Sequence, residues 1–181
     1  MSKAIIVLAN GFEEIEFSYP TSILRDAKFD VLTVSITGSL IVEGAHGIQI
    51  EADSLWDDSD LLSGDVLVLP GGQPGTDNLC LFNKLGCVVD YYTKNRTVAA
   101  ICAAPIILGK RGLLQGKKAT CYPGYEKQLL GCEYLEESFV IDNNIITARG
   151  PGAAQDFALA IVDVVGGHEL FLHLKENVLG E

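Results

Sequence analysis

Four stretches of the chain are apolar at most positions, a pattern typical of strands buried on both faces of a parallel sheet. They span residues 3–9, 30–36, 65–69 and 97–101. Segments with apolar residues at helical spacing alternate with these stretches or follow them. The predicted helices span residues 13–27, with a kink at Pro20, and residues 79–94, 104–109 and 153–165. This alternation predicts an α/β protein whose mostly parallel central sheet is covered on both faces.

Two pairs of short apolar runs predict β-hairpins. Residues 40–42 and 48–50 form the first pair, and residues 139–142 and 145–147 form the second. His46 lies in the turn of the first hairpin, where we expect it to be solvated or, if the hairpin projects, to reach a neighbouring subunit. Shorter elements are predicted at residues 118–121 as a strand and at residues 126–130 and 168–177 as helices.

The length and charge of the chain limit its number of domains and the classes of partner it can bind. Its 181 residues fit one domain, residues 1–181, with enough material for a sizeable core. A net charge of −11 repels nucleic acid and anionic membranes, so we expect neither as a partner, while a small neutral substrate is compatible. The first apolar run is too short for a signal segment, and no run approaches the roughly 18 apolar residues of a membrane span. We therefore expect a cytoplasmic protein.

The cysteines and histidines do not form a metal-binding or disulfide pattern. Five cysteines, without a CxxC pair, argue against a disulfide framework and for a reducing compartment. The three histidines lack the spacing of metal ligands, so we expect no metal. Four of the cysteines are interpreted as packing residues without a chemical role: Cys80, Cys87, Cys121 and Cys132.

Cys102 is the candidate nucleophile because it stands between a predicted strand and a predicted helix that opens near Pro105. Free backbone N–H groups and the positive end of a helix dipole surround such a position, and both favour thiolate over thiol. The alternative is that Cys102 is inert packing, since free cysteine is among the most buried residue types.

Two other elements are expected at the same edge of the sheet. Glu16 falls just beyond the first strand, at the carboxyl edge where open α/β sheets bind ligands, although an acidic first helical turn is the plainer interpretation. Gly71 and Gly72 follow the strand at 65–69 and can present backbone N–H groups to a ligand, or can simply end the strand. If the three strands are neighbours, these residues and Cys102 share one pocket.

Four segments in order along the chain, LANGFEEIEF, VLPGG, AAICAAP and ITARGPG, resemble the ThiJ/PfpI superfamily, most closely its Parkinson disease protein deglycase (DJ-one) branch. The resemblance implies a flavodoxin-like three-layer sandwich with a small β-hairpin, no cofactor and a homodimer. It also implies that Cys102 lies on a nucleophile elbow with Glu16 as its partner acid, and that the N–H groups of Gly72 and Ala103 stabilise an oxyanion. Gly71 and Tyr122 are expected to bind substrate.

The same resemblance implies a glyoxalase III or deglycase activity on a small aldehyde. Cys102 would attack a 2-oxoaldehyde such as methylglyoxal, or an early glycation adduct, and a 2-hydroxy acid would be formed while Glu16 moves protons. A carboxylate opposes a neighbouring thiolate, so we expect the two groups to titrate as a pair, with the pKa of Glu16 raised and that of Cys102 lowered.

The sequence departs from the superfamily pattern at two positions, and two functions other than a glyoxalase or deglycase activity are considered. Ala103 follows the nucleophile where protease-like members carry His, so a peptidase triad is not supported, and Tyr122 stands where animal relatives carry His. The alternative function is an oxidative-stress sensor or redox-regulated chaperone, in which Cys102 is oxidised to sulfinate. An FMN-binding function is disfavoured because no Ser/Thr-rich phosphate loop follows the first strand.

Overall fold

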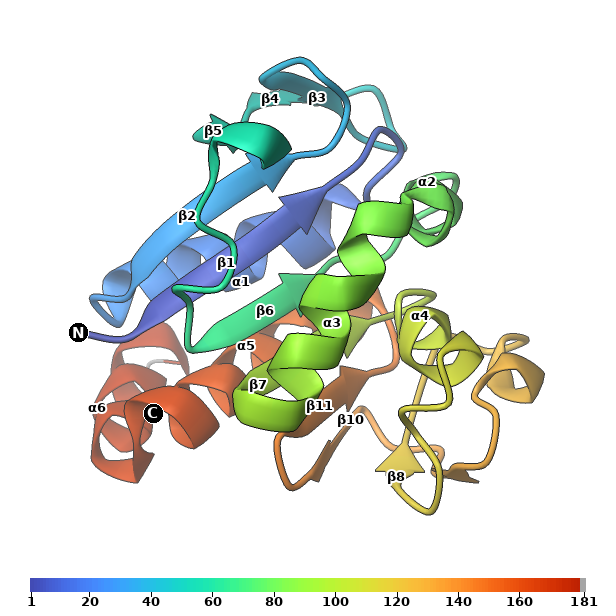
Figure 1. Ribbon diagram of the computed structural model, residues 1–181. Coiled ribbons are helices and arrows are strands. Elements are labelled where there is room, and N and C mark those ends of the chain that lie inside the picture. Colours follow the sequence, from blue (N-terminus) through green and yellow to red (C-terminus); the bar gives the residue numbers. More distant parts are fainter. Residues whose placement is uncertain (180–181) are drawn as a thin grey trace.

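The computed structural model describes residues 1–179, and its centre is a seven-stranded sheet (Figure 1). The strand order is β10-β11-β7-β6-β1-β2-β5. All neighbours are parallel except β10 and β11, which form an antiparallel hairpin at one edge. The strands are β1 (Lys3–Leu8), β2 (Asp30–Ser35), β5 (Ser54–Leu55), β6 (Val66–Leu69), β7 (Thr97–Ile101), β10 (Phe139–Asp142) and β11 (Ile145–Ala148).

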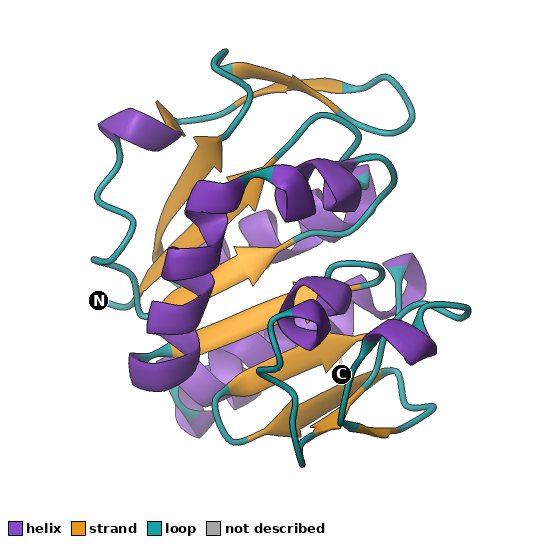
Figure 2. Cartoon of the chain, turned by 45° about the vertical axis from the view of Figure 1, so that its right-hand side comes forward, coloured by secondary structure: helices purple, strands orange, loops and turns teal. Residues whose placement is uncertain are grey.

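Helices cover both faces of this sheet, which gives the three layers that Figures 1 and 2 show. Residues of α1, α5 and α6 belong to the core on one face, and residues of α2, α3 and α4 to the core on the other. The flavodoxin-like sandwich expected from the sequence is confirmed. The helices are α1 (Glu14–Asp26), α2 (Gly75–Leu81), α3 (Asn83–Asn95), α4 (Pro105–Lys110), α5 (Ala154–Ile161) and α6 (His168–Leu179).

The apolar strands are continuous because each supplies side chains to both cores. In β1, Ile6 and Leu8 pack on the α1 side and Ile5 and Val7 pack on the α3 side, all of them fully buried. Successive side chains of a strand point to opposite faces, so a strand between two helical layers needs apolar residues at every position.

A small hairpin, β3 (Ile41–Glu43) and β4 (Gln49–Glu51), stands apart from the main sheet, as predicted. It docks on the loop that follows β1. The Gly11 N–H donates to the Glu43 carbonyl over 2.7 Å, and the Ala45 N–H donates to the Phe12 carbonyl over 2.8 Å. The hairpin therefore holds the β1–α1 loop in place.

Four predicted elements differ from the structure, among them the helix expected at 126–130, which is a 3-10 helix that ends at Gln128. The helix expected at 79–94 is divided into two helices at Phe82, whose backbone is not helical (φ −80°, ψ 89°). The Phe82 ring packs edge-on against Trp56, with 4.9 Å between the ring centroids. The strand expected at 118–121 ends at Ala119, and the helix expected to reach residue 165 finishes in a π-helical turn. The remaining short elements are η1 (Trp56–Asp58), β8 (Lys118–Ala119), η2 (Glu126–Gln128), β9 (Glu133–Tyr134), η3 (Pro151–Ala153) and η4 (Val162–Gly166).

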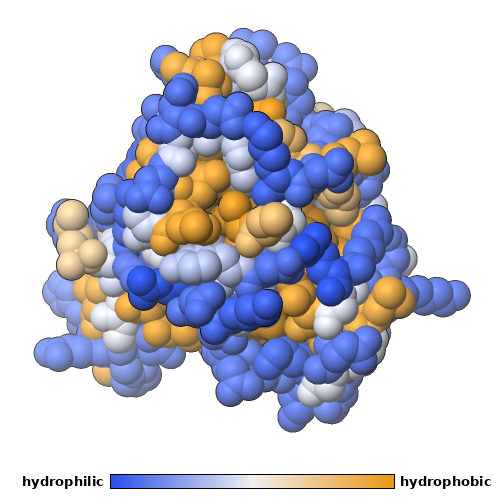
Figure 3. Space-filling view, in the orientation of Figure 1, coloured by the Kyte–Doolittle hydropathy of each residue, from blue (hydrophilic) through white to orange (hydrophobic). Residues whose placement is uncertain are grey.

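One face of the molecule can be described by the hydropathy of its residues. Figure 3 shows a mostly hydrophilic face, with apolar side chains gathered toward its middle. Across residues 1–179, none of the helices has both the length and the apolar character needed to cross a bilayer.

The packing of the sheet can be tested at Leu67, which is fully buried in β6. Leu67→Ala removes buried methyl groups and leaves a cavity, so it should lower the free energy of unfolding by about 2–5 kcal/mol. Urea denaturation measures this loss. The control is Leu81→Ala on α2, where the side chain is 77% exposed and little should change. Equal losses in the two variants would contradict the burial described.

Candidate active site

Cys102 directly follows β7 and has a backbone conformation that is unusual for a residue with a side chain. Its φ is +66°, in the left-handed region that non-glycine residues rarely adopt. Two hydrogen bonds of 2.8 Å hold it there: its N–H donates to the Ala148 carbonyl, and its carbonyl accepts from the Tyr122 N–H. The residue is 8% exposed. Such a strand-to-helix turn is the geometry of a nucleophile elbow.

Glu16 lies in the first turn of α1 and is fully buried. Glu13 caps this helix, since its Oε2 accepts from the Glu16 N–H over 2.8 Å. The Glu16 carboxyl reaches toward the neighbouring strand, where its Oε2 accepts from the Gly71 N–H over 2.9 Å. Among the residues described, its other oxygen, Oε1, has no hydrogen-bond partner. One oxygen therefore fixes the carboxyl, and the second remains available for chemistry.

Gly71 separates the carboxyl of Glu16 from Cys102. A Cβ at Gly71 would lie only 2.6 Å from both the Cys102 Cβ and the Glu16 Oε2. Gly72, at φ +91°, is equally confined, because a Cβ there would lie 2.4 Å from the Glu13 nitrogen. Since β1, β6 and β7 are neighbours in the sheet, the three strand ends predicted to meet do lie side by side.

The pKa of Glu16 is raised to about 8, mainly by burial and also by the nearby charge of Glu13. Hydrogen bonds to the Cys102 side chain and the Gly71 amide oppose this rise. Its ordinary value is 4.5, so the carboxyl keeps its proton at neutral pH. The direction agrees with the expectation from the sequence.

The pKa of Cys102 moves in the opposite direction from our expectation. Burial raises it first, and the charge and hydrogen bond of Glu16 raise it further, while the amides of Gly72 and Ala103 lower it. The expected lowering is wrong because α4 has only six residues, so few peptide dipoles add at its N-terminus, and because the thiol is buried. Each group shifts the other, so the two titrate as a unit.

Tyr122 lies beside this pair and forms the wall of a groove. The groove has a volume of about 320 Å³ and is lined by residues 122–123 and 149–153 together with Ser138. The Tyr122 ring covers Gly150, where a Cβ would lie 3.1 Å from the ring. Of the two residues predicted to bind substrate, Tyr122 lines this groove and Gly71 does not.

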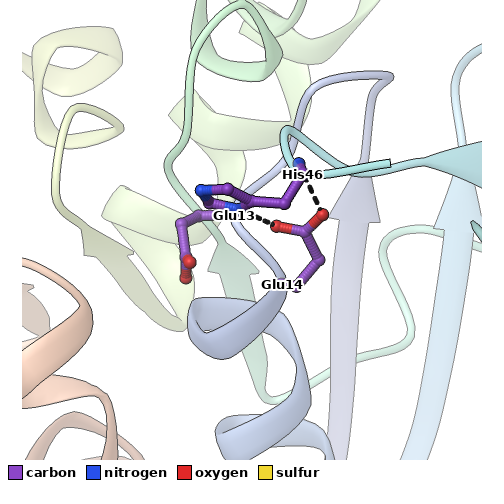
Figure 4. A group of neighbouring side chains, drawn as sticks. All are labelled: Glu13, Glu14 and His46. Carbon is purple, nitrogen blue, oxygen red and sulfur yellow. Dashed lines mark hydrogen bonds and ion pairs between the residues drawn. The ribbon is translucent and has the colours of Figure 1, made fainter. Parts of the chain in front are cut away.

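His46 is not merely solvated, as we had expected, but pairs with Glu14 (Figure 4). Its Nδ1 lies 2.6 Å from Oε2 of Glu14, and its backbone N–H donates to Oε1 over 2.7 Å. Burial raises the pKa of Glu14, but the two hydrogen bonds from His46 lower it, and the net shift is downward. The side-chain bond to Glu14 raises the pKa of His46. With Glu13 they offer three ligand atoms within 4.8 Å, a grouping that histidine spacing alone does not reveal. Within residues 1–179 no other such group occurs, and the absence of a bound metal stays a prediction.

The other cysteines lie outside the pair. Cys121 is buried, which raises its pKa to about 12, and Cys80 and Cys132 are partly buried. Cys87 is exposed, so its interpretation as a packing residue is wrong. Of the remaining histidines, His168 pairs with Asp163 at 2.8 Å.

The raised pKa of Glu16 predicts how stability changes with pH. Between pH 4.5 and about 8 the folded chain keeps a proton that the unfolded chain loses, so the carboxyl lowers stability as pH rises. Glu16→Gln cannot titrate, and its stability relative to wild type should therefore increase over this range, by at most about 5 kcal/mol. The Cys102 thiol, with an ordinary value of 9.0, does not contribute there.

Urea denaturation of both proteins at pH 5 and pH 8 measures this change. Glu51→Gln, on the exposed surface of β4, is the matched control and should follow wild type. A stability difference between Glu16→Gln and wild type that is the same at both pH values would contradict a raised pKa.

The profile of the DJ-1/PfpI family matches residues 2–164 of the chain. The chain is 35% identical to protein DJ-1 homolog B of Arabidopsis thaliana over 177 residues, which are 97% of this chain and 40% of that protein. It thus spans less than half the length of this relative, and of homolog A, of which it covers 45%. It is also 35% identical to protein dj-1beta of Drosophila melanogaster, with 99% of this chain and 98% of that protein covered. Oxidized DJ-1 of Toxoplasma gondii superposes with a TM-score of 0.94 at 30% identity, covering 99% of this chain and 98% of that one. The chain belongs to the DJ-1/PfpI family.

Proposed function

We propose that this chain is a cysteine-dependent glyoxalase or deglycase that converts 2-oxoaldehydes such as methylglyoxal, or their early glycation adducts, into 2-hydroxy acids. One observation carries the proposal: a cysteine in a left-handed turn and a protonated carboxyl meet across a glycine that leaves no space between them. The free thiols suit a reducing compartment, so the proposed location is the cytoplasm.

The first step is the formation of a hemithioacetal. Once the pair has lost one proton, the Glu16 carboxylate takes the proton of the Cys102 thiol, which leaves a thiolate beside a carboxylic acid. The sulfur attacks the aldehyde carbon, a C–S bond forms, and the electron pair of the C=O bond moves to oxygen. The amides of Gly72 and Ala103, which already interact with the Cys102 sulfur, are positioned to stabilise this alkoxide until Glu16 protonates it.

The second step moves a proton from carbon to carbon. Glu16, now a carboxylate, takes the proton from the former aldehyde carbon and gives an enediolate. The hydroxyl proton on that carbon moves to the neighbouring oxygen, and Glu16 returns the carbon-bound proton to the adjacent carbon. The product is a thioester of the 2-hydroxy acid. Water hydrolyses this thioester, so that one aldehyde and one water yield one 2-hydroxy acid, and the thiolate and the carboxylic acid are restored.

Activity on methylglyoxal tests this function. Cys102→Ser should lower kcat/KM by more than about 1,000-fold, because the nucleophile is lost. Glu16→Gln should lower it by about 100- to 10,000-fold, because Gln retains the bond to Gly71 but cannot transfer a proton. The measurement is the loss of aldehyde together with the formation of 2-hydroxy acid.

Cys87→Ser, at an exposed thiol away from the site, is the control and should match wild type. Activity that survives both site substitutions would end this assignment. An inactive wild type whose Cys102 forms a stable sulfinate under peroxide would instead support the redox-sensor alternative.

The second part of the proposal is a homodimer formed through α1 and the β3–β4 hairpin. Ile15 and Tyr19 lie one turn apart on α1 and are each 44% exposed, and Ile48 on the hairpin is 56% exposed. Large exposed apolar side chains on adjacent elements are typical of an interaction surface. The family resemblance favours a second copy of the chain as the occupant.

Ile15→Glu tests this surface by placing a charge at its centre. The variant should sediment as a monomer at a concentration where wild type sediments as a dimer, because burying an unpaired carboxylate is costly. Leu81→Glu makes the same change at a more exposed leucine on α2 and should leave the dimer intact. An unchanged mass for Ile15→Glu would place the interface elsewhere.

A further inference from the structure

Arg149 lies next to Cys102 at the carboxyl edge of the sheet. Ala148, the last residue of β11, is paired in register with Ile101, the last residue of β7. The Cys102 N–H donates to the Ala148 carbonyl over 2.8 Å. Arg149 and Cys102 are therefore the first residues to leave two neighbouring parallel strands, at the same level of the sheet.

The Arg149 side chain borders the groove that Tyr122 walls. Apart from Arg149 and Ser138, the groove is lined by glycine, proline and alanine residues and by the Tyr122 ring. The backbone links this space to the candidate nucleophile, because the Tyr122 N–H donates to the Cys102 carbonyl. The groove that holds Arg149 is therefore one backbone hydrogen bond away from Cys102.

Arg149 differs from the other arginines of the chain in having no counter-ion. Arg25, Arg96 and Arg111 each form an ion pair with an aspartate. Within the described part of the chain, the half-buried Arg149 guanidinium forms no ion pair and no side-chain hydrogen bond. Glu126 accepts from the Gly124 N–H over 2.7 Å, which lowers its pKa, and the charge of Arg149 lowers that pKa further, but no ion pair or hydrogen bond joins the two side chains, both of which the structure describes. Five N–H donors beside an apolar space remain available to a ligand.

The charge of its surroundings indicates which ligand suits this guanidinium. The chain carries a net charge of −11, and Glu13 lies close enough to Glu16, the partner of Cys102, for its charge to act on that carboxyl. An anionic substrate would be repelled there unless a fixed cation compensated. A guanidinium binds carboxylate and phosphate through two parallel hydrogen bonds, which a neutral group cannot match.

We propose that Arg149 is a specificity-determining residue that selects substrates carrying a carboxylate or phosphate, whose apolar part lies in the groove against Tyr122. The substrates are 2-oxoaldehydes, or adducts derived from them, that bear such an anionic group. This inference rests on the proposed function for the reaction itself. The recognition of an anion beside Cys102 does not depend on turnover and can be measured separately.

The first measurement compares alkylation of Cys102 by iodoacetate and by iodoacetamide, two reagents of similar size that differ in charge. Mass spectrometry of the Cys102 peptide gives both rates. Arg149→Met should lower the ratio of the iodoacetate rate to the iodoacetamide rate by about 10-fold or more, the effect of losing a charge-assisted hydrogen bond. Arg149→Lys should recover part of it. Arg96→Met removes the same charge next to the first residue of β7, at the opposite end of that strand, and should leave the ratio unchanged.

The second measurement compares kcat/KM for phenylglyoxal and 4-carboxyphenylglyoxal. In Arg149→Met the value for the carboxylated aldehyde should fall by about 10- to 100-fold, with the value for phenylglyoxal within about twofold of wild type. Inhibition by benzoate and by phenyl phosphate then distinguishes a carboxylate from a phosphate as the preferred group.

The two measurements separate this inference from the proposed function. If wild type converts neither aldehyde while iodoacetate alkylation still depends on Arg149, the glyoxalase assignment fails and the anion site stands. If the alkylation ratio of Arg149→Met equals that of wild type, the anion site is overturned, whatever the turnover.

Discussion

The approach of a carboxyl group to a thiol across Gly71 is the contact on which the rest of the site depends. No side chain fits between Glu16 and Cys102, since even a single methyl group would lie 2.6 Å from both. The same glycine donates its N–H to the carboxyl. Gly71 therefore has two functions: it leaves space for the pair, and it holds one of its members. A larger residue would move the carboxyl, the sulfur or the strand end that carries them.

The sheet order explains why this contact can form at all. The residues come from three segments that are distant in sequence, but β1, β6 and β7 are consecutive in the sheet and end at one edge. Parallel strands bring their carboxyl ends together there, and the loops that leave them are free to carry polar groups. The β3–β4 hairpin then fixes the first of these loops through the bond from Gly11 to Glu43. The architecture places the site, and the loops supply its chemistry.

The sequence predicted what depends on pattern and missed what depends on packing. Continuous apolar runs predicted β1 and β6, and their positions indicated that Glu16 and Gly71 would meet Cys102. The pKa of Cys102 was predicted in the wrong direction, because a strand-to-helix junction is visible in the sequence, whereas the burial of the thiol is not. The pairing of His46 with Glu14 was missed because the two residues are 32 positions apart. The sequence does not single out Arg149, because the absence of an ion pair can be recognised only in three dimensions.

The distribution of partners among the three buried glutamates determines where a proton can reside. Glu13 accepts from an N–H of the helix it caps, and Glu14 is paired with His46, whose hydrogen bonds lower the pKa of Glu14 against the effect of burial. Glu16 is fully buried, and among the described residues only the Gly71 amide and the Cys102 side chain bond to its carboxyl, so it is the one that retains a proton. When the pair loses one proton, amides of two loops stabilise a charge on sulfur, whereas a charge on Glu16 would stand close to that of Glu13. Burial raises the pKa of the thiol all the same, so the thiolate forms only when Glu16 takes up the thiol proton as the sulfur attacks.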